Sequence, residues 1–105
     1  MTSDLQARVL ATFHRATAAG DKLDSLPKLS MPQDMYVWSG DYTTKYFNLN
    51  QAYMSLCNAF HRPEYSINDV EIGMRQLDKA ICAVDSHVEC RSNYFKSKDL
   101  KVNKL

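Results

Sequence analysis

The sequence predicts an α+β protein that is mostly helical, with a core of three helices and one short β-hairpin. Apolar residues recur at steps of three and four over three segments, at about 4–19, 49–62 and 67–92. The stretch 35–47, MYVWSGDYTTKYF, places five of the chain's aromatic side chains around a Ser-Gly-Asp turn. A length of 105 residues with 45% hydrophobic content is typical of one globular domain, which we expect to cover residues 1–105.

The first helix is predicted to begin after Ser3, because Ser3 and Gln6 have the spacing of a capping box. Its apolar side continues to Ala16, and Gly20 is expected to end it. Two prolines in residues 21–34 then predict a loop.

The hairpin is predicted to pair residues 35–38 with 42–47, because valine, threonine and aromatic residues favour strands. An alternative is an all-α bundle, in which Asp41 caps a second helix that starts near residue 42. Tyr46 would then extend the apolar stripe of Leu49, Tyr53, Leu56 and Phe60.

The segment 67–92 carries the strongest helical signal, a bulky stripe with three-four spacing over three heptads. A second, narrower stripe of Gly73, Ala80 and His87 lies about 80° away on the same helix, where another backbone could approach closely. We expect helix 49–62 to pack on the bulky stripe and helix 4–19 near the small one. The residues of the bulky stripe are Ile67, Val70, Met74, Leu77, Ile81, Val84 and Val88.

Charge is distributed unevenly along the chain. Residues 1–90 carry eight basic and eleven acidic side chains, whereas residues 91–105 carry five basic and one acidic. The segment 93–105 is therefore expected to be a basic C-terminal arm. Such an arm is a usual contact for nucleic acid or acidic surfaces, with Arg91, Lys96, Lys98, Lys101 and Lys104 as the candidate phosphate contacts.

The three cysteines cannot all pair within one chain, and Cys82 and Cys90 are about 12 Å apart along a helix, too far for a disulfide. Free thiols favour a reducing compartment. Neither a secretory signal nor an apolar run of membrane-spanning length stands in the sequence. We therefore expect a cytoplasmic protein with no membrane contact.

The sequence gives only a weak indication of a metal site. Cys57 and His61 share a helix face, as do His87 and Cys90, and two such pairs could supply four zinc ligands. Their directions on the helical wheel diverge, so no metal or other cofactor is expected. The tripeptide Asp85-Ser86-His87 cannot form a hydrolase triad, because adjacent residues on a helix point about 100° apart. No catalytic residue is assigned, and the chain is expected not to be an enzyme.

The aromatic residues remain as the candidate contact surface, because a small hairpin cannot bury alternate side chains on both of its faces. We expect a small non-enzymatic module that binds another protein and inhibits or assists it by occlusion, as viral accessory proteins of phage type do. Self-association is a further expectation. The alternative is a nucleic-acid-associated protein that uses the basic arm and exposed rings. The predicted partner contacts are Tyr36, Trp38, Tyr42, Tyr46, Glu71 and Arg75.

Overall fold

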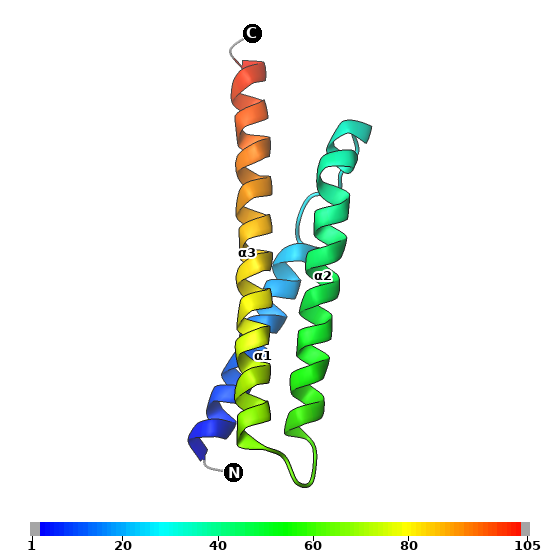
Figure 1. The fold of residues 1–105 in the computed structure, drawn as a ribbon. Coiled ribbons are helices and arrows are strands. Elements are labelled where there is room, and N and C mark those ends of the chain that lie inside the picture. Colours follow the sequence, from blue (N-terminus) through cyan, green and yellow to red (C-terminus); the bar gives the residue numbers. More distant parts are fainter. Residues whose placement is uncertain (1–2, 104–105) are drawn as a thin grey trace.

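The protein is a three-helix bundle in which the chain runs up, down and up. The computed structural model describes the backbone of residues 3–103 and the side chains of residues 4–97. Its helices are α1 (Ser3–Asp24), α2 (Pro32–Phe60) and α3 (Ile67–Asn103). Figure 1 shows α1 and α3 running in parallel, with α2 antiparallel to both and α3 extending past the start of α2. The result is an elongated body of 62 × 22 × 17 Å.

The predicted β-hairpin at 35–47 is wrong, and so is the α+β class, because residues 3–103 contain helices and no strand. Asp34, just before this stretch, and Trp38 and Asp41 within it contact α3 at steps of four and three, and Lys45 follows Asp41 by four residues and pairs with it. They continue the stripe of Leu49 and Leu56 toward the N-terminus. Two aspartates within the stripe concealed the helical period from a search for apolar residues.

The all-α alternative has the right class but starts the second helix too late. Pro32 takes the first turn of α2, where its missing N–H costs nothing, and Met31 before it is extended. At the other end α2 stops at Phe60 rather than at Arg62. His61 closes the helix, since its N–H donates to the carbonyl of Cys57 at 3.0 Å.

The other two helices are also longer than predicted. Gly20 does not end α1, because it keeps a negative φ and the helix continues to Asp24. The α3 helix continues past residue 92 to Asn103, so the part of the predicted arm within the described backbone, residues 93–103, is helical. Residues 25–31 form the connection between α1 and α2, shorter than the predicted loop of 21–34.

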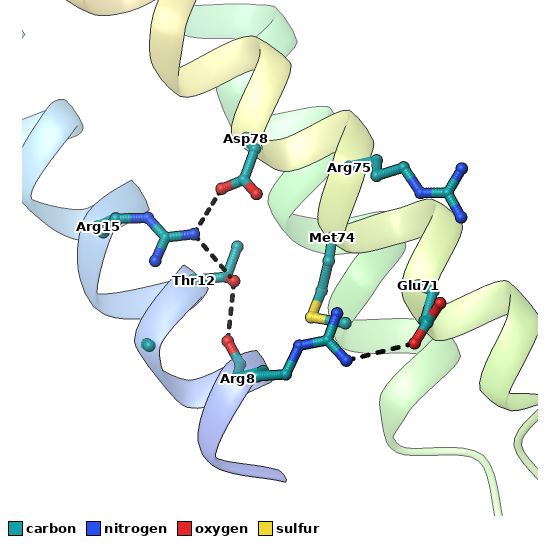
Figure 2. A pocket seen from close by; sticks show the side chains of 8 residues that line it. Arg8, Thr12, Arg15, Glu71, Met74, Arg75 and Asp78 are labelled. Atoms are coloured by element: carbon teal, nitrogen blue, oxygen red, sulfur yellow. Dashed lines mark hydrogen bonds and ion pairs between the residues drawn. The ribbon is translucent and has the colours of Figure 1, made fainter. Parts of the chain in front are cut away.

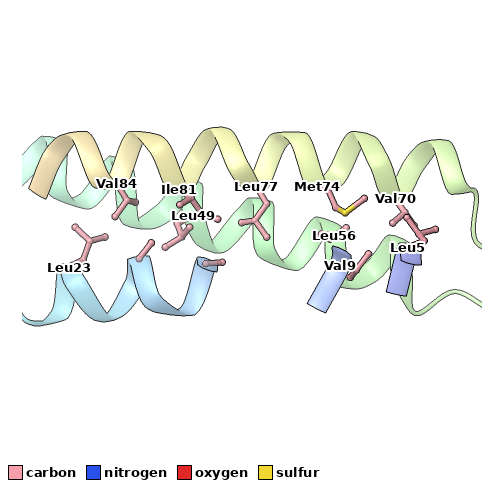
Figure 3. Close-up of a cluster of buried hydrophobic side chains, with 12 residues drawn as sticks. Leu5, Val9, Leu23, Leu49, Leu56, Val70, Met74, Leu77, Ile81 and Val84 are labelled. Carbon is pink, nitrogen blue, oxygen red and sulfur yellow. The ribbon is translucent and has the colours of Figure 1, made fainter. Parts of the chain in front are cut away.

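The core runs along the line where the three helices meet (Figure 3). Five residues of the predicted bulky stripe on α3 are buried, from Val70 to Val84, which confirms that stripe. Ile67 is exposed at the start of α3, and Val88 is only partly buried. Fully buried side chains from the three helices meet there and contribute to the hydrophobic stabilisation of the bundle: Val9, Leu23, Leu56, Val70, Leu77 and Val84.

The small stripe of α3 faces α2, not α1 as expected. A methyl group added at Gly73 would lie 3.1 Å from Leu56 Cδ1 and 3.4 Å from Leu56 Cα, so the two backbones approach closely here. His87, on the same stripe, contacts Asp41 of α2. The small residues thus bring α2, rather than α1, against α3.

The α1 helix packs on the other flank of α3, where three ion pairs form a ladder. Arg8 pairs with Glu71, Arg15 with Asp78 and Lys22 with Asp85, at 3.3, 2.6 and 3.2 Å. Each successive pair lies seven residues further along both helices, so the ladder has a heptad period. Every rung places the base on α1 and the acid on α3.

Gly73 provides a test of the close helix approach. We expect Gly73→Leu to lower the free energy of unfolding by about 2 kcal/mol, because Leu56 cannot withdraw its backbone from the added atoms. Gly20→Ala is the matched control, since its methyl group would meet Leu49 Cδ2 at an ordinary 3.9 Å. It should raise the free energy of unfolding by about 0.5–1 kcal/mol through helix propensity. Urea denaturation followed by circular dichroism measures both, and a Gly73→Leu protein as stable as wild type would contradict the packing.

The ladder provides a second test. Arg15→Glu should lower the free energy of unfolding by less than about 1 kcal/mol at low salt, because both partners of this rung are half exposed. The difference should shrink in 1 M salt by screening. Adding Asp78→Arg should restore the stability by re-forming the rung with its charges exchanged. A double variant no more stable than the single one would show that this rung contributes nothing.

Candidate functional site

The α2 helix turns all of its charged side chains toward α3. Its 29 residues contain three charged side chains, Asp34, Asp41 and Lys45. Asp34 is buried and its Oδ1 accepts a hydrogen bond from the Tyr94 hydroxyl at 3.1 Å. Asp41 contacts His87, and Lys45 pairs with Asp41 at 3.2 Å. Both aspartates of α2 therefore make polar contacts with α3, and Lys45 joins this cluster through Asp41.

The contact between Asp41 and His87 is the shortest of these. His87 Nδ1 lies 2.7 Å from Asp41 Oδ2, and the His87 side chain is fully buried. Since an ionised carboxylate can only accept, the ring N–H donates. This hydrogen bond lowers the pKa of Asp41 below its usual value of 3.8, with Lys45 adding to the effect and burial opposing it.

Aromatic rings and an arginine enclose this pair. The ring of Trp38 stands edge-on to the rings of His87 and Tyr94, with distances between ring centres of 5.6 and 5.4 Å. Arg91 is 4% exposed, donates from Nη2 to the carbonyl of Pro27, and lies 5.9 Å from the centre of the Tyr42 ring. Burial lowers the pKa of the Arg91 guanidinium. Arg91 thus ties the connection between α1 and α2 to α3.

The opposite side of α2 carries no charge at all. At about 100° per residue, Tyr36, Phe47 and Met54 fall within about 20° of one line along the helix. Their side chains are 91%, 59% and 60% exposed. We call the exposed residues between Gln33 and Asn58 that lie within about 60° of this line the uncharged face: Gln33, Tyr36, Gly40, Thr43, Phe47, Asn50, Gln51, Met54 and Asn58.

The uncharged face differs from the other helix surfaces. The exposed sides of α1 and α3 carry charged residues, among them Asp4, Arg15, Arg75 and Lys79. Water-facing positions of a helix are usually charged, whereas depletion of charge with enrichment in Tyr, Phe and Met is typical of the centre of protein interfaces. An extra methyl group at Gly40 would have no atom within 4 Å, so the space above this face is open.

The structure separates the residues predicted to contact a partner. Tyr36 belongs to the uncharged face, whereas Trp38 and Tyr42 are partly buried against α3. Tyr46 is partly buried beside Asp24 of α1, whose carboxylate raises the pKa of the Tyr46 phenol.

Glu71 and Arg75 lie elsewhere, at a shallow groove of about 240 Å³ between α1 and α3. Figure 2 shows Glu71 held by Arg8 on one side of Met74, while Arg75 points out of the groove. The six predicted contacts therefore do not form one surface.

The candidate phosphate contacts are also divided. Arg91 is buried beneath the α1–α2 connection, while Lys96 is exposed. The side chains of Lys98 and Lys101, and the whole of Lys104, lie outside the described residues.

The two candidate metal pairs lie far apart. His61 Nδ1 lies 2.7 Å from the backbone carbonyl oxygen of Cys57. His87 contacts Asp41, which precedes Cys57 by sixteen residues, or roughly 24 Å along α2. Cys90 is exposed on α3. Among the described side chains, no group of three or more His, Cys, Asp or Glu residues could hold a metal ion.

Sequence reasoning missed Phe47, Met54 and Gly40 as members of a contact surface. The usable signal was present: Tyr36, Phe47 and Met54 follow one another at intervals of eleven and seven residues, which is three turns and two turns of a helix. The absence of Lys, Arg, Asp and Glu from the same positions was a second signal. Both require residues 35–47 to be helical, and the hairpin hypothesis hid them.

The chain matches no family model, no curated protein and no solved structure. Among the described residues, none of the helices combines the length and the hydropathy needed to cross a bilayer.

The Asp41–His87 contact predicts a defined pH dependence. Because the pKa of Asp41 is lower in the folded state, its contribution to stability is complete above about pH 4 and is lost as the pH falls through the folded-state pKa. Asp41→Asn should therefore lower the free energy of unfolding most above pH 5, and the difference from wild type should narrow toward pH 2. Denaturant titrations at several pH values measure this. In a His87→Gln background, Asp41→Asn should lower the free energy of unfolding by less. If the stability difference between Asp41→Asn and wild type does not change with pH, the hydrogen bond to His87 is not what lowers the pKa of Asp41.

Proposed function

We propose that this protein is a small binding module without chemistry of its own, and that it contacts another protein chain through the uncharged face of α2. The observation that carries the proposal is the separation of charge on α2: its three charged residues lie together on the opposite side of the helix, and none stands on the exposed row from Gln33 to Asn58. Folding alone does not require this, because exposed positions tolerate charged residues and gain solubility from them.

The size and shape of the face suit a helix or a flat surface of a partner. At 1.5 Å per residue, the 26 residues of this row span about 38 Å along the helix. The width of the row is that of one helix, about 10 Å. Its exposed aromatic and methionine side chains can act as anchors, and the amides of Asn50, Gln51 and Asn58 can supply hydrogen bonds around them. Binding here would cover the contacted part of the partner, which is how such a module would act by occlusion.

Capture from native lysate tests this proposal. The wild-type protein and Phe47→Lys are immobilised side by side, and the retained proteins are identified with and without nuclease. We expect at least one protein to be retained by wild type, to survive nuclease and to be depleted at least tenfold on Phe47→Lys. The physical reason is that a lysine at the centre of the face would have to lose its hydration without a charged partner.

Leu10→Lys is the matched control, because Leu10 is a half-exposed apolar residue on α1, away from the uncharged face. It should retain the same proteins as wild type. Circular dichroism checks that both variants stay folded, as expected for substitutions at exposed positions. If wild type and Phe47→Lys retain the same proteins in the same amounts, the uncharged face is not the binding surface.

A further inference from the structure

We infer that the uncharged face is occupied by a second copy of this chain, in a two-fold dimer whose α2 helices pack antiparallel. This inference rests on the proposed function and names the partner of the same surface.

The absence of charge on this face favours a second copy as its partner. In a two-fold interface, the same patch of both subunits meets itself, so any charge on the patch is brought close to an identical charge. A face with charge of one sign would repel its copy, whereas a face with no charge meets its copy without a Coulomb penalty. The flank between α1 and α3 lacks this property, since α1 presents Arg8, Arg15 and Lys22 there and α3 presents Glu71, Asp78 and Asp85 beside them.

The large exposed side chains of the uncharged face are placed symmetrically along α2. Tyr36 and Met54 lie equally far from residue 45, close to the middle of α2. A two-fold axis crossing α2 at that level places Tyr36 opposite Met54 of the partner subunit, and the same contact occurs a second time by symmetry. Phe47 then lies opposite Thr43 of the partner subunit, and Gly40 opposite its Asn50. The large side chains thus meet smaller or flexible ones, and Gly40 leaves room for close approach.

The basic end of the chain decides between the two directions of packing. Residues 91–105 carry five basic and one acidic side chain, and the last described turns of α3, which belong to this segment, extend past the start of α2 (Figure 1). A parallel dimer would bring two such ends together at one end of the assembly. An antiparallel dimer places them at opposite ends, where they repel least.

The area of the face sets the expected affinity. A strip about 38 Å by 10 Å belongs to the small class of interfaces, below about 1,200 Å² in total, which is typical of reversible association. We therefore expect a dissociation constant on the order of 10 µM and a monomer–dimer equilibrium in the micromolar range.

Sedimentation equilibrium of the purified protein from about 1 to 500 µM tests the dimer. Wild type should pass from monomer to dimer across this range. Phe47→Lys should raise the dissociation constant at least tenfold, and Gly40→Lys should do the same, because each substitution is present twice in the interface. Leu10→Lys and Ile72→Lys, at half-exposed apolar positions on α1 and α3, should leave the dissociation constant within about twofold of wild type.

A distance measurement tests the direction. Cys57, Cys82 and Cys90 are replaced by serine, and a spin label is attached to Gln33→Cys at the edge of the face. In the antiparallel dimer the two labelled positions are separated by 24 residues of helix, or about 36 Å, whereas a parallel dimer brings them within about 15 Å. A distance near 36 Å supports the proposed packing, and a distance below 20 Å overturns it.

The outcomes separate this inference from the proposed function. A protein that stays monomeric at 500 µM, while lysate capture still depends on Phe47, overturns the dimer and leaves the binding module intact. A dimer that forms equally well with Phe47→Lys and Gly40→Lys places self-association elsewhere and also overturns the inference. If capture is equally insensitive to Phe47→Lys, the proposed function fails with it.

Discussion

The contact between Asp41 and His87 fixes the orientation of α2, and much of the molecule's character follows from it. A fully buried histidine and a partly buried aspartate need each other, since either one left without a partner would carry a desolvation cost. Their hydrogen bond holds Asp41 against α3, and Lys45 and Asp34 follow on the same side because they are four and seven residues away. Apolar packing alone would tolerate small rotations of α2 about its axis, whereas a hydrogen-bonded polar cluster permits fewer. The interior of the bundle thereby determines which residues of α2 remain on its outside.

The sequence allowed much of the core to be predicted and little of the candidate site. The stripe on α3 was legible because Val70, Met74, Leu77, Ile81 and Val84 are apolar and regularly spaced. The first half of α2 was not, because its inward positions include Asp34 and Asp41, whose partners His87 and Tyr94 lie far away in sequence. Local preference favoured a hairpin around Ser39 and Gly40, and tertiary contacts overrode that preference. The position of α2 beside Gly73 also depended on a contact with Leu56 that no local pattern encodes.

The wrong assignment of one segment therefore had a consequence for function. In the predicted hairpin the side chains have a period of two, and Tyr36, Trp38, Tyr42 and Tyr46 were all expected to contact a partner. In a helix the same four residues are divided, and Tyr36 joins Phe47 and Met54 instead. The aromatic side chains were correctly suspected of exceeding what the interior could hide, but which of them stay exposed depends on the period of the backbone.

The ladder between α1 and α3 has a further property. Its three rungs share one spacing and one polarity, so a slide of α1 by one heptad would still match Arg8 with Asp78 and Arg15 with Asp85. Electrostatics alone thus discriminate poorly between neighbouring alignments of the two parallel helices. The alignment must be selected by features that do not repeat every seven residues, such as the short tether of residues 25–31 and its anchoring by Arg91 at Pro27. A longer tether would therefore make the alignment of α1 along α3 less specific, although each ion pair of the ladder could still form.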